Sequence, residues 1–353
     1  SLTGAALAGV DLSGVDLSGI DFTDADLTGA DLTGANLTRA NLTRARLVGA
    51  DLSDSTVSEV NLTGATMQGA VLRGASSGDV VFYAGVTLPA GWRVMNGYLV
   101  GPGARLVGAT LDIGQLTNAD LSEADLTGAT FRYANLHGAT LRNTKLVGAD
   151  LTSATLTDAT LTGADITGAV FTTDNDNKFA GIISGVLVGS PAHLPISGRF
   201  RTVEGYFVGP VVNLTGARFS PSAHLGTALG ATDFTGADLT GLDLTGATLN
   251  NANFTDATLT GATLSAANMS AATLTGVTSG GIVGHPALPA GWQMLNGHLV
   301  GQGAKLSGAH LSEVNLTGAD LSGADLTGAD LTDAWLTGTT LHDVRLTGAN
   351  LTG

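Results

Sequence analysis

The 353-residue sequence contains no cysteine, only eight prolines, and few aromatic residues, which make up 5% of the chain. Without cysteine the chain forms no disulfide bond and offers no thiolate for catalysis or metal binding. The longest smooth apolar run covers residues 180–189, which is too short to cross a bilayer. No secretory signal pattern is visible, so the sequence slightly favours a cytoplasmic location.

Basic residues are also scarce, with 15 Lys and Arg against 30 Asp and Glu and a net charge of −15. This balance disfavours direct binding of nucleic acid or of anionic membranes, and it favours a partner with a basic surface. A simpler alternative is that the acidic side chains only keep the protein soluble.

Catalytic and metal-binding patterns are missing as well. None of the seven histidines has metal-ligand spacing to another. Matches to Gly-x-Gly, such as Gly101-Pro102-Gly103, arise from the high glycine content and do not indicate a phosphate site. We therefore predict no catalytic residues, no cofactor, no metal site and no enzymatic activity.

A five-residue phrase, Ala-Asp-Leu-Thr-Gly, dominates what is present. Around Leu326, for example, an apolar residue recurs every fifth position, preceded two positions earlier by a small residue. A period of five matches neither the helical period of 3.6 nor the strand period of 2. A chain that turns a corner every five residues would keep each leucine pointing inward, which is typical of a solenoid.

In this phrase the sequence resembles the pentapeptide-repeat family. The resemblance implies an all-β fold, a right-handed quadrilateral β-helix solenoid with four pentapeptides, or 20 residues, in each coil. The repeats present would form about 13 coils.

Three related interruptions divide the repeats into four blocks of one continuous rod-like domain. The predicted segments alternate between repeat blocks and inserts: 1–75, 76–105, 106–171, 172–213, 214–274, 275–305 and 306–353. The pairs Asn96-Gly97 and Asn296-Gly297, each flanked by apolar residues, predict type I′ β-hairpins, because both positions of that turn need positive φ. The insert at 172–213 is a degenerate copy. Alternatively, each insert forms one widened, irregular coil.

A 20-residue coil predicts that residues twenty apart stack in columns. Two columns then alternate in charge, which is mildly stabilising across neighbouring strands, and one stacks like charges. They are Arg105, Asp125, Lys145 and Asp165; Lys305, Asp325 and Arg345; and Asp11, Asp31 and Asp51. We interpret the last as a solvated acidic stripe rather than a cation site.

The aromatic residues of the inserts are the candidate partner contacts, because Trp and Tyr are typical interface anchors. Trp92, Tyr98, Trp292 and His298 occupy corresponding positions in the first and third inserts, and Trp335 stands at an outward position of a repeat. Alternatively, the insert aromatics pack on the protein's own flank.

Two functions are consistent with these features. The first is a non-enzymatic scaffold that presents its hairpins to a protein partner with a basic or aromatic-accepting surface. The second, implied by the family resemblance, is an acidic DNA mimic that binds a type II topoisomerase and protects or inhibits gyrase. Its charge is dilute, since about one charge per 4 Å compares with one per about 1.7 Å for duplex DNA. Open coil ends would also favour end-to-end or homodimeric association.

Overall fold

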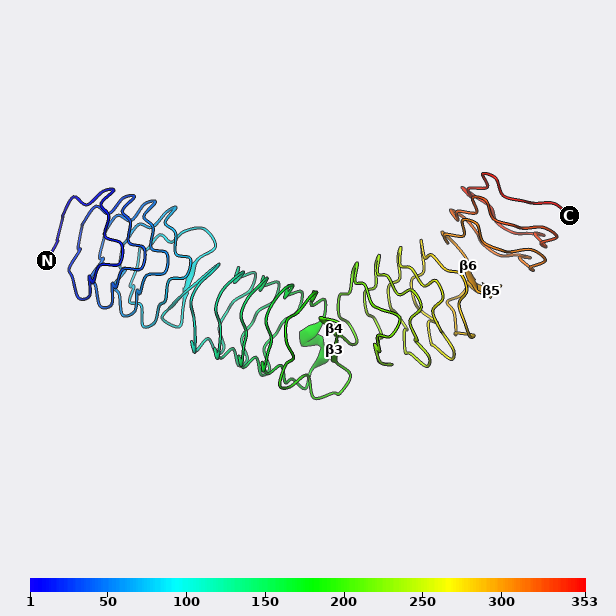
Figure 1. Ribbon diagram of the computed structural model, residues 1–353, viewed down its shortest axis with the longest axis horizontal. Coiled ribbons are helices and arrows are strands. Elements are labelled where there is room, and N and C mark those ends of the chain that lie inside the picture. Colours follow the sequence, from blue (N-terminus) through cyan, green and yellow to red (C-terminus); the bar gives the residue numbers. More distant parts are fainter. The chain divides into compact units, whose positions relative to one another are not determined.

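The computed structural model describes residues 1–353, which form two compact units (Figure 1). The first contains Ser1–Lys178 and Val186–Pro195, and the second contains Phe179–Gly185 and Ile196–Gly353. Both units consist of stacked turns of backbone. The protein contains no helix with the length and apolar character of a membrane span.

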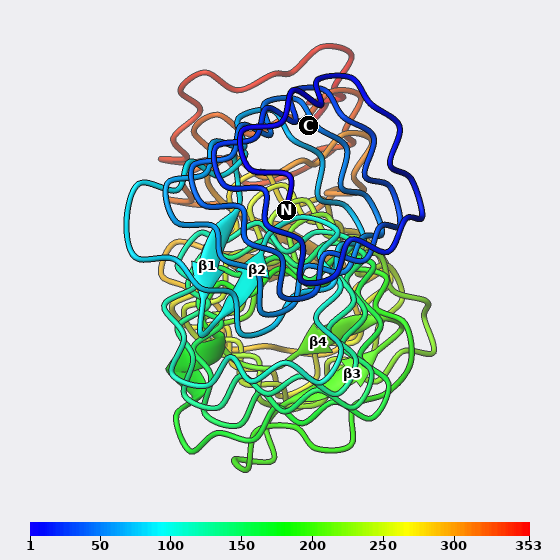
Figure 2. The same ribbon diagram turned by 90° about the vertical axis from the view of Figure 1, so that its left-hand side faces the viewer.

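The coils have the predicted length of 20 residues. Parallel bridges join Asp26 to Arg46 and Arg46 to Thr66, and the same spacing recurs through all four blocks. Seen end-on, the first coils wind one after another around a common interior (Figure 2). The chain is a right-handed quadrilateral β-helix solenoid, as the resemblance to the pentapeptide-repeat family implies.

Each repeat satisfies its five backbone N–H groups in a fixed way. In the repeat Asp26–Ala30, the Asp26 N–H donates to the preceding coil at 2.9 Å, whereas the Leu27 and Gly29 N–H groups donate to the following coil at 2.7 and 2.9 Å. The Ala30 N–H closes a turn on the Leu27 carbonyl at 3.1 Å. The Thr28 N–H donates to Oδ1 of Asp26 at 3.1 Å. The preference for Asp or Asn before the leucine therefore has a backbone cause.

The corner of each repeat lies at its fourth residue, which is Gly29 in the repeat Asp26–Ala30. Gly29 has φ of +63°, which gives the Leu27–Ala30 turn the positive third position of a type II turn. Asp24, Arg39 and Glu59 adopt similar φ values of 60°, 62° and 57° at equivalent corners. Glycine is therefore common at the corners but not obligatory.

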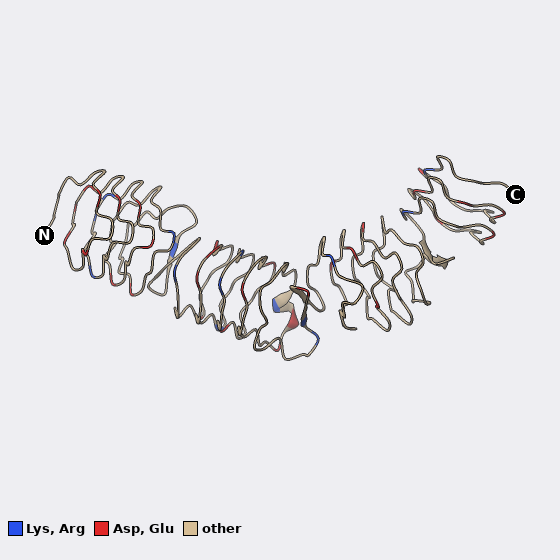
Figure 3. Ribbon diagram, in the orientation of Figure 1, with Lys and Arg blue, Asp and Glu red and all other residues tan.

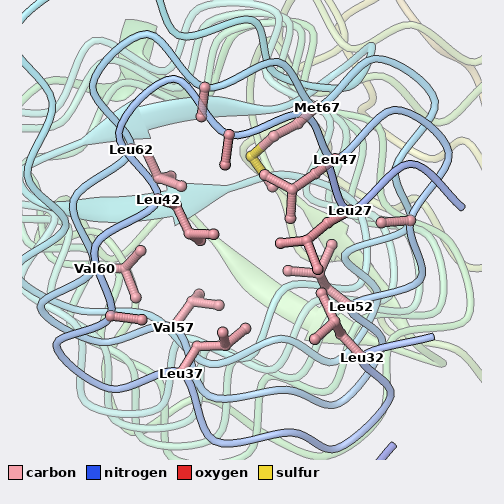
Figure 4. Packing of buried hydrophobic residues seen from close by; sticks show 14 of the residues in the cluster. Leu27, Leu32, Leu37, Leu42, Leu47, Leu52, Val57, Val60, Leu62 and Met67 are labelled. Atoms are coloured by element: carbon pink, nitrogen blue, oxygen red, sulfur yellow. The ribbon is translucent and has the colours of Figure 1, made fainter. Parts of the chain in front are cut away.

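The leucines of successive sides point into the coil and stack on those of the coils above and below. Leu27, Leu32, Leu37 and Leu42 are fully buried in one such cluster (Figure 4). Full burial of a leucine contributes about 1.5–3 kcal/mol, so this repeated core is the main stabilising element of the fold.

The three interruptions contain antiparallel hairpins, as predicted. The pairs are β1 (Arg93–Met95) with β2 (Tyr98–Val100), β3 (Arg201–Val203) with β4 (Tyr206–Val208), and β5 (Gln293–Leu295) with β6 (His298–Val300). Both turn residues have positive φ, 48° and 81° at Asn96 and Gly97, which matches a type I′ turn. The second hairpin turns through Glu204 and Gly205 in the same way, with φ of 48° and 80°.

One element of the second interruption was not predicted, the short 3-10 helix η1 (Asp176–Phe179). The exact boundaries of the four repeat blocks and three inserts stay a prediction.

The three predicted columns form as parallel bridges, but their charges pair only in part. Lys145 lies 3.6 Å from Asp125 within its column. Lys305, in contrast, forms its ion pair at 2.8 Å with Asp256, outside its column. Stacking was therefore predictable from the period, whereas the ion-pair partners were not.

Candidate partner-binding surface at the hairpin modules

In each module, one buried serine of the coil beneath accepts a hydrogen bond from the hairpin. The N–H of Leu99 donates to Oγ of Ser77 at 2.9 Å. The other hairpins repeat this bond, from Phe207 to Ser184 at 2.7 Å and from Leu299 to Ser279 at 2.9 Å. The three modules are thus built alike, although the second has diverged in sequence.

An aromatic ring at the start of each module lies over a glycine that ends it. A Cβ atom on Gly101 would lie 2.3 Å from Cδ2 of Trp92, and one on Gly301 would lie 2.5 Å from Cδ2 of Trp292. In the second module Phe200 covers Gly209 in the same manner, at 2.6 Å from its Cδ1. Phe200 was not among the predicted contacts, although its place in the degenerate copy could have revealed it.

The second pair of insert aromatics packs on the protein's own coils. The ring of Tyr98 lies against Gly78, and Nδ1 of His298 lies 2.9 Å from the carbonyl oxygen of Ser279. Desolvation by burial lowers the pKa of His298 below its ordinary value of 6.5, although its bond to Ser279 opposes this. For Tyr98 and His298 the structure matches the alternative of packing on the flank.

The three tryptophans differ in accessibility. Trp92 and Trp292 are half-buried. Trp92 packs against the hydrophobic core of the first block, and Trp292 packs against that of the fourth block. Trp335 is 66% exposed at its outward position. Whether any of them contacts a partner stays a prediction.

Two grooves meet beside the first hairpin. One, of about 340 Å³, is mainly apolar and includes Pro89, Trp92 and Pro102 in its wall. The other, of about 500 Å³, is lined by charged residues, including Arg105 and Lys145. Both grooves are bounded by the same three residues, Arg73, Gly103 and Glu123.

An ion pair crosses this junction from the first block to the second. Nη2 of Arg73 lies 2.7 Å from Oε2 of Glu123, fifty residues away in the sequence. Gly103 lies between them, and a Cβ atom there would be 2.7 Å from Cγ of Arg73. The third module has a corresponding pair, Lys305 with Asp256, which joins the third block to the fourth. Both pairs are exposed, so each contributes at most about 1 kcal/mol to stability.

The repeats themselves decide the family. The family profile described as Pentapeptide repeats (8 copies) matches four stretches that together cover most of the chain, 1–76, 104–172, 213–276 and 302–353, through overlapping matches. The chain belongs to the pentapeptide-repeat family.

Solved pentapeptide-repeat structures align with the chain at low similarity. HetL, a protein involved in heterocyst differentiation regulation from the cyanobacterium Nostoc, is 21% identical over 97% of this chain and 89% of its own, with a TM-score of 0.21. QnrB1, a plasmid-mediated fluoroquinolone resistance protein, is 23% identical over 46% of this chain and 75% of its own, with a TM-score of 0.20. A pentapeptide repeat protein from the Arabidopsis thaliana thylakoid lumen is 25% identical over 43% and 68%, with a TM-score of 0.15. No curated protein matches the sequence.

Most acidic side chains of this pentapeptide-repeat protein also serve its backbone. Sixteen aspartates accept a hydrogen bond from the N–H group two residues further on. At Asp26, bonds from the side chain and then the backbone of Thr28 hold the pKa below its ordinary value of 3.8. The acidic coat is therefore part of the fold.

Proposed function

We propose that this protein is a non-enzymatic repeat scaffold that binds a protein partner at its hairpin modules, with the first module as the main contact. The family supports the scaffold role, since a solenoid of regular coils is a rigid support for surface modules. The observation that carries the proposal is the pair of adjoining grooves at the first hairpin, where Trp92 supplies an aromatic wall. Half-buried tryptophans in grooves are frequent energetic centres of interfaces.

The test uses partner binding by single alanine variants of Trp92, Trp292 and Trp335. A partner purified by its binding to the full chain should lose at least about tenfold in affinity for the Trp92→Ala variant. The Tyr133→Ala variant is a control matched to Trp335→Ala, because Tyr133 is an aromatic residue on a coil corner with nearly the same exposure, 65% against 66%. Unchanged binding by all three tryptophan variants would overturn the proposal.

The DNA-mimic alternative has support in the hydrogen-bonded aspartates. Hydrogen bonds from Thr and Ser lower the pKa of residues such as Asp11, Asp26 and Asp325 below the ordinary value of 3.8, so these carboxylates stay charged even in mildly acidic solution. Addition of the protein to a gyrase supercoiling reaction distinguishes the two functions. Inhibition or protection at micromolar concentration supports mimicry, and no effect removes this alternative.

A further inference from the structure

We propose that the two adjoining grooves of the first hairpin module form one site for an extended peptide segment of the partner, with an apolar side chain next to a carboxylate. The inference rests on the proposed scaffold function and gives the recognised chemistry. The apolar side chain would pack between Trp92, Pro89 and Pro102, and the carboxylate would pair with Arg105.

The apolar half of the site is held rigidly. The ring of Trp92 is fixed over Gly101, and the N–H of Trp92 donates to the carbonyl of Pro89 at 3.1 Å. The prolines have no rotatable side chain to order on binding, so little entropy is lost there. A preformed groove with an aromatic wall suits an apolar side chain.

The charged half holds three cations and three carboxylates, but they are not all paired. Arg73 pairs with Glu123 at 2.7 Å, and Lys145 lies 3.6 Å from Asp125. Arg105 is exposed and forms no ion pair. Its guanidinium is therefore the one cation of this groove left to bind a carboxylate from outside, and guanidinium groups can do so with two parallel hydrogen bonds.

In the third module the equivalent cation already forms an ion pair within the protein. Its equivalent of Arg105 is Lys305, which is already paired at 2.8 Å with Asp256, the equivalent of Asp54. Gln302 stands in place of Pro102, and Thr275 in place of Arg73. The first module therefore combines an arginine that forms no ion pair, Arg105, with the proline wall of Pro102. The third module has neither feature, so it lacks the proposed site.

The charge around the first module also suits an acidic segment. Residues 73–145 contain six Lys and Arg against five Asp and Glu, whereas residues 275–345, around the third module, contain two against six. Acidic residues are spread over the coils of both units (Figure 3). The overall charge favours basic partners, but the three carboxylates of the charged groove, Asp54 among them, are balanced by its three cations, so an added carboxylate meets less repulsion here than on the acidic coils elsewhere.

One continuous segment can serve both halves, because the grooves share the wall formed by Arg73, Gly103 and Glu123. Because Gly103 has no side chain, nothing projects between the two grooves at this position. A segment that crosses here would place its apolar residue and its carboxylate within a few residues of each other.

The test selects phage-displayed random dodecapeptides on the purified full-length protein and measures the affinity of the enriched peptides by fluorescence polarisation. We expect a consensus with an apolar residue close to Asp or Glu. Affinity should fall by at least about tenfold for Trp92→Ala and for Arg105→Glu. Trp92→Phe should bind within about threefold of the wild type, because Phe200 fills this position over Gly209 in the second module.

Lys305→Glu is the matched control, since it places the same charge change at the equivalent corner, and it should bind like the wild type. The proposal is overturned by a failure to enrich peptides, by a consensus without an acidic residue, or by peptides that bind Arg105→Glu normally. Self-association that competes with the peptides, seen by light scattering, would assign the groove to a second copy of the chain and overturn it too. If a native partner depends on Trp92 but not on Arg105, the groove chemistry is wrong and the scaffold function stands.

Discussion

The amide nitrogen of Leu99 lies 2.9 Å from the hydroxyl oxygen of Ser77, which belongs to the coil beneath the first hairpin. Both residues are buried, and the same serine bond recurs at the other two hairpins. If the hairpin projected into solvent, its amide groups would bind water and would not be buried against an acceptor on the coil. The bond shows that the module is a packed part of the solenoid.

Replacement of Ser77 by alanine should loosen the first hairpin. The Leu99 N–H would be left buried without an acceptor, which costs about 1–3 kcal/mol. Hydrogen exchange should show faster exchange of the Leu99 amide and of the amides of β1 and β2. Ser76→Ala is the control, because the Ser76 hydroxyl makes only long contacts of 3.3 and 3.5 Å. Equal exchange in the two variants would contradict a role for the serine as anchor.

The aspartate caps should make the first block sensitive to acid. Hydrogen bonds from hydroxyl and amide groups two residues further on lower the pKa values of Asp11, Asp16, Asp21 and Asp26. A lowered folded-state pKa contributes stability that is present above the unfolded pKa of about 3.9 and is lost as pH falls through the folded value. The thermal unfolding midpoint of the wild type should therefore drop on acidification from pH 5 to pH 2.

A variant with asparagine at these four positions provides the comparison. Asparagine can accept the same bond, as Asn36 and Asn41 do at equivalent positions, but it does not titrate. We expect this variant to fold and to lose less stability over the same pH range. Parallel pH profiles for the two proteins would show that the caps do not cause the acid sensitivity.

The regular part of the molecule was predictable because one local rule is repeated. The spacing of leucines such as Leu326 determines which residues point inward, and Asn96-Gly97 has strong turn preferences of its own. The ion pair of Arg73 with Glu123 was not predictable, since its partners come together only when the path of the intervening insert is known. The serine anchors were missed for the same reason, because nothing in the local sequence around Ser77 marks it as the partner of a distant hairpin.

The buried leucines should differ strongly from those at the edge of the core. Leu42 is fully buried, whereas Leu2 is 37% exposed. Leu42→Ala removes packed methyl groups and leaves a cavity, which should lower the free energy of unfolding of its block by about 2–5 kcal/mol. Leu2→Ala should cost clearly less. Denaturant unfolding followed by circular dichroism measures both, and similar costs would contradict the core described for the first block.

Gly101→Ala should disturb the partner site without removing any of its side chains. The new methyl group would lie 2.3 Å from Cδ2 of Trp92, so the indole ring must move. Overpacking of this kind costs about 1–3 kcal/mol. We expect a loss of partner binding comparable to that of Trp92→Ala, together with a change in tryptophan fluorescence.

In a Trp92→Ala background the same glycine change should have a smaller effect on stability, because the clashing ring is gone. Additive effects of the two changes would mean that the ring does not rest on Gly101.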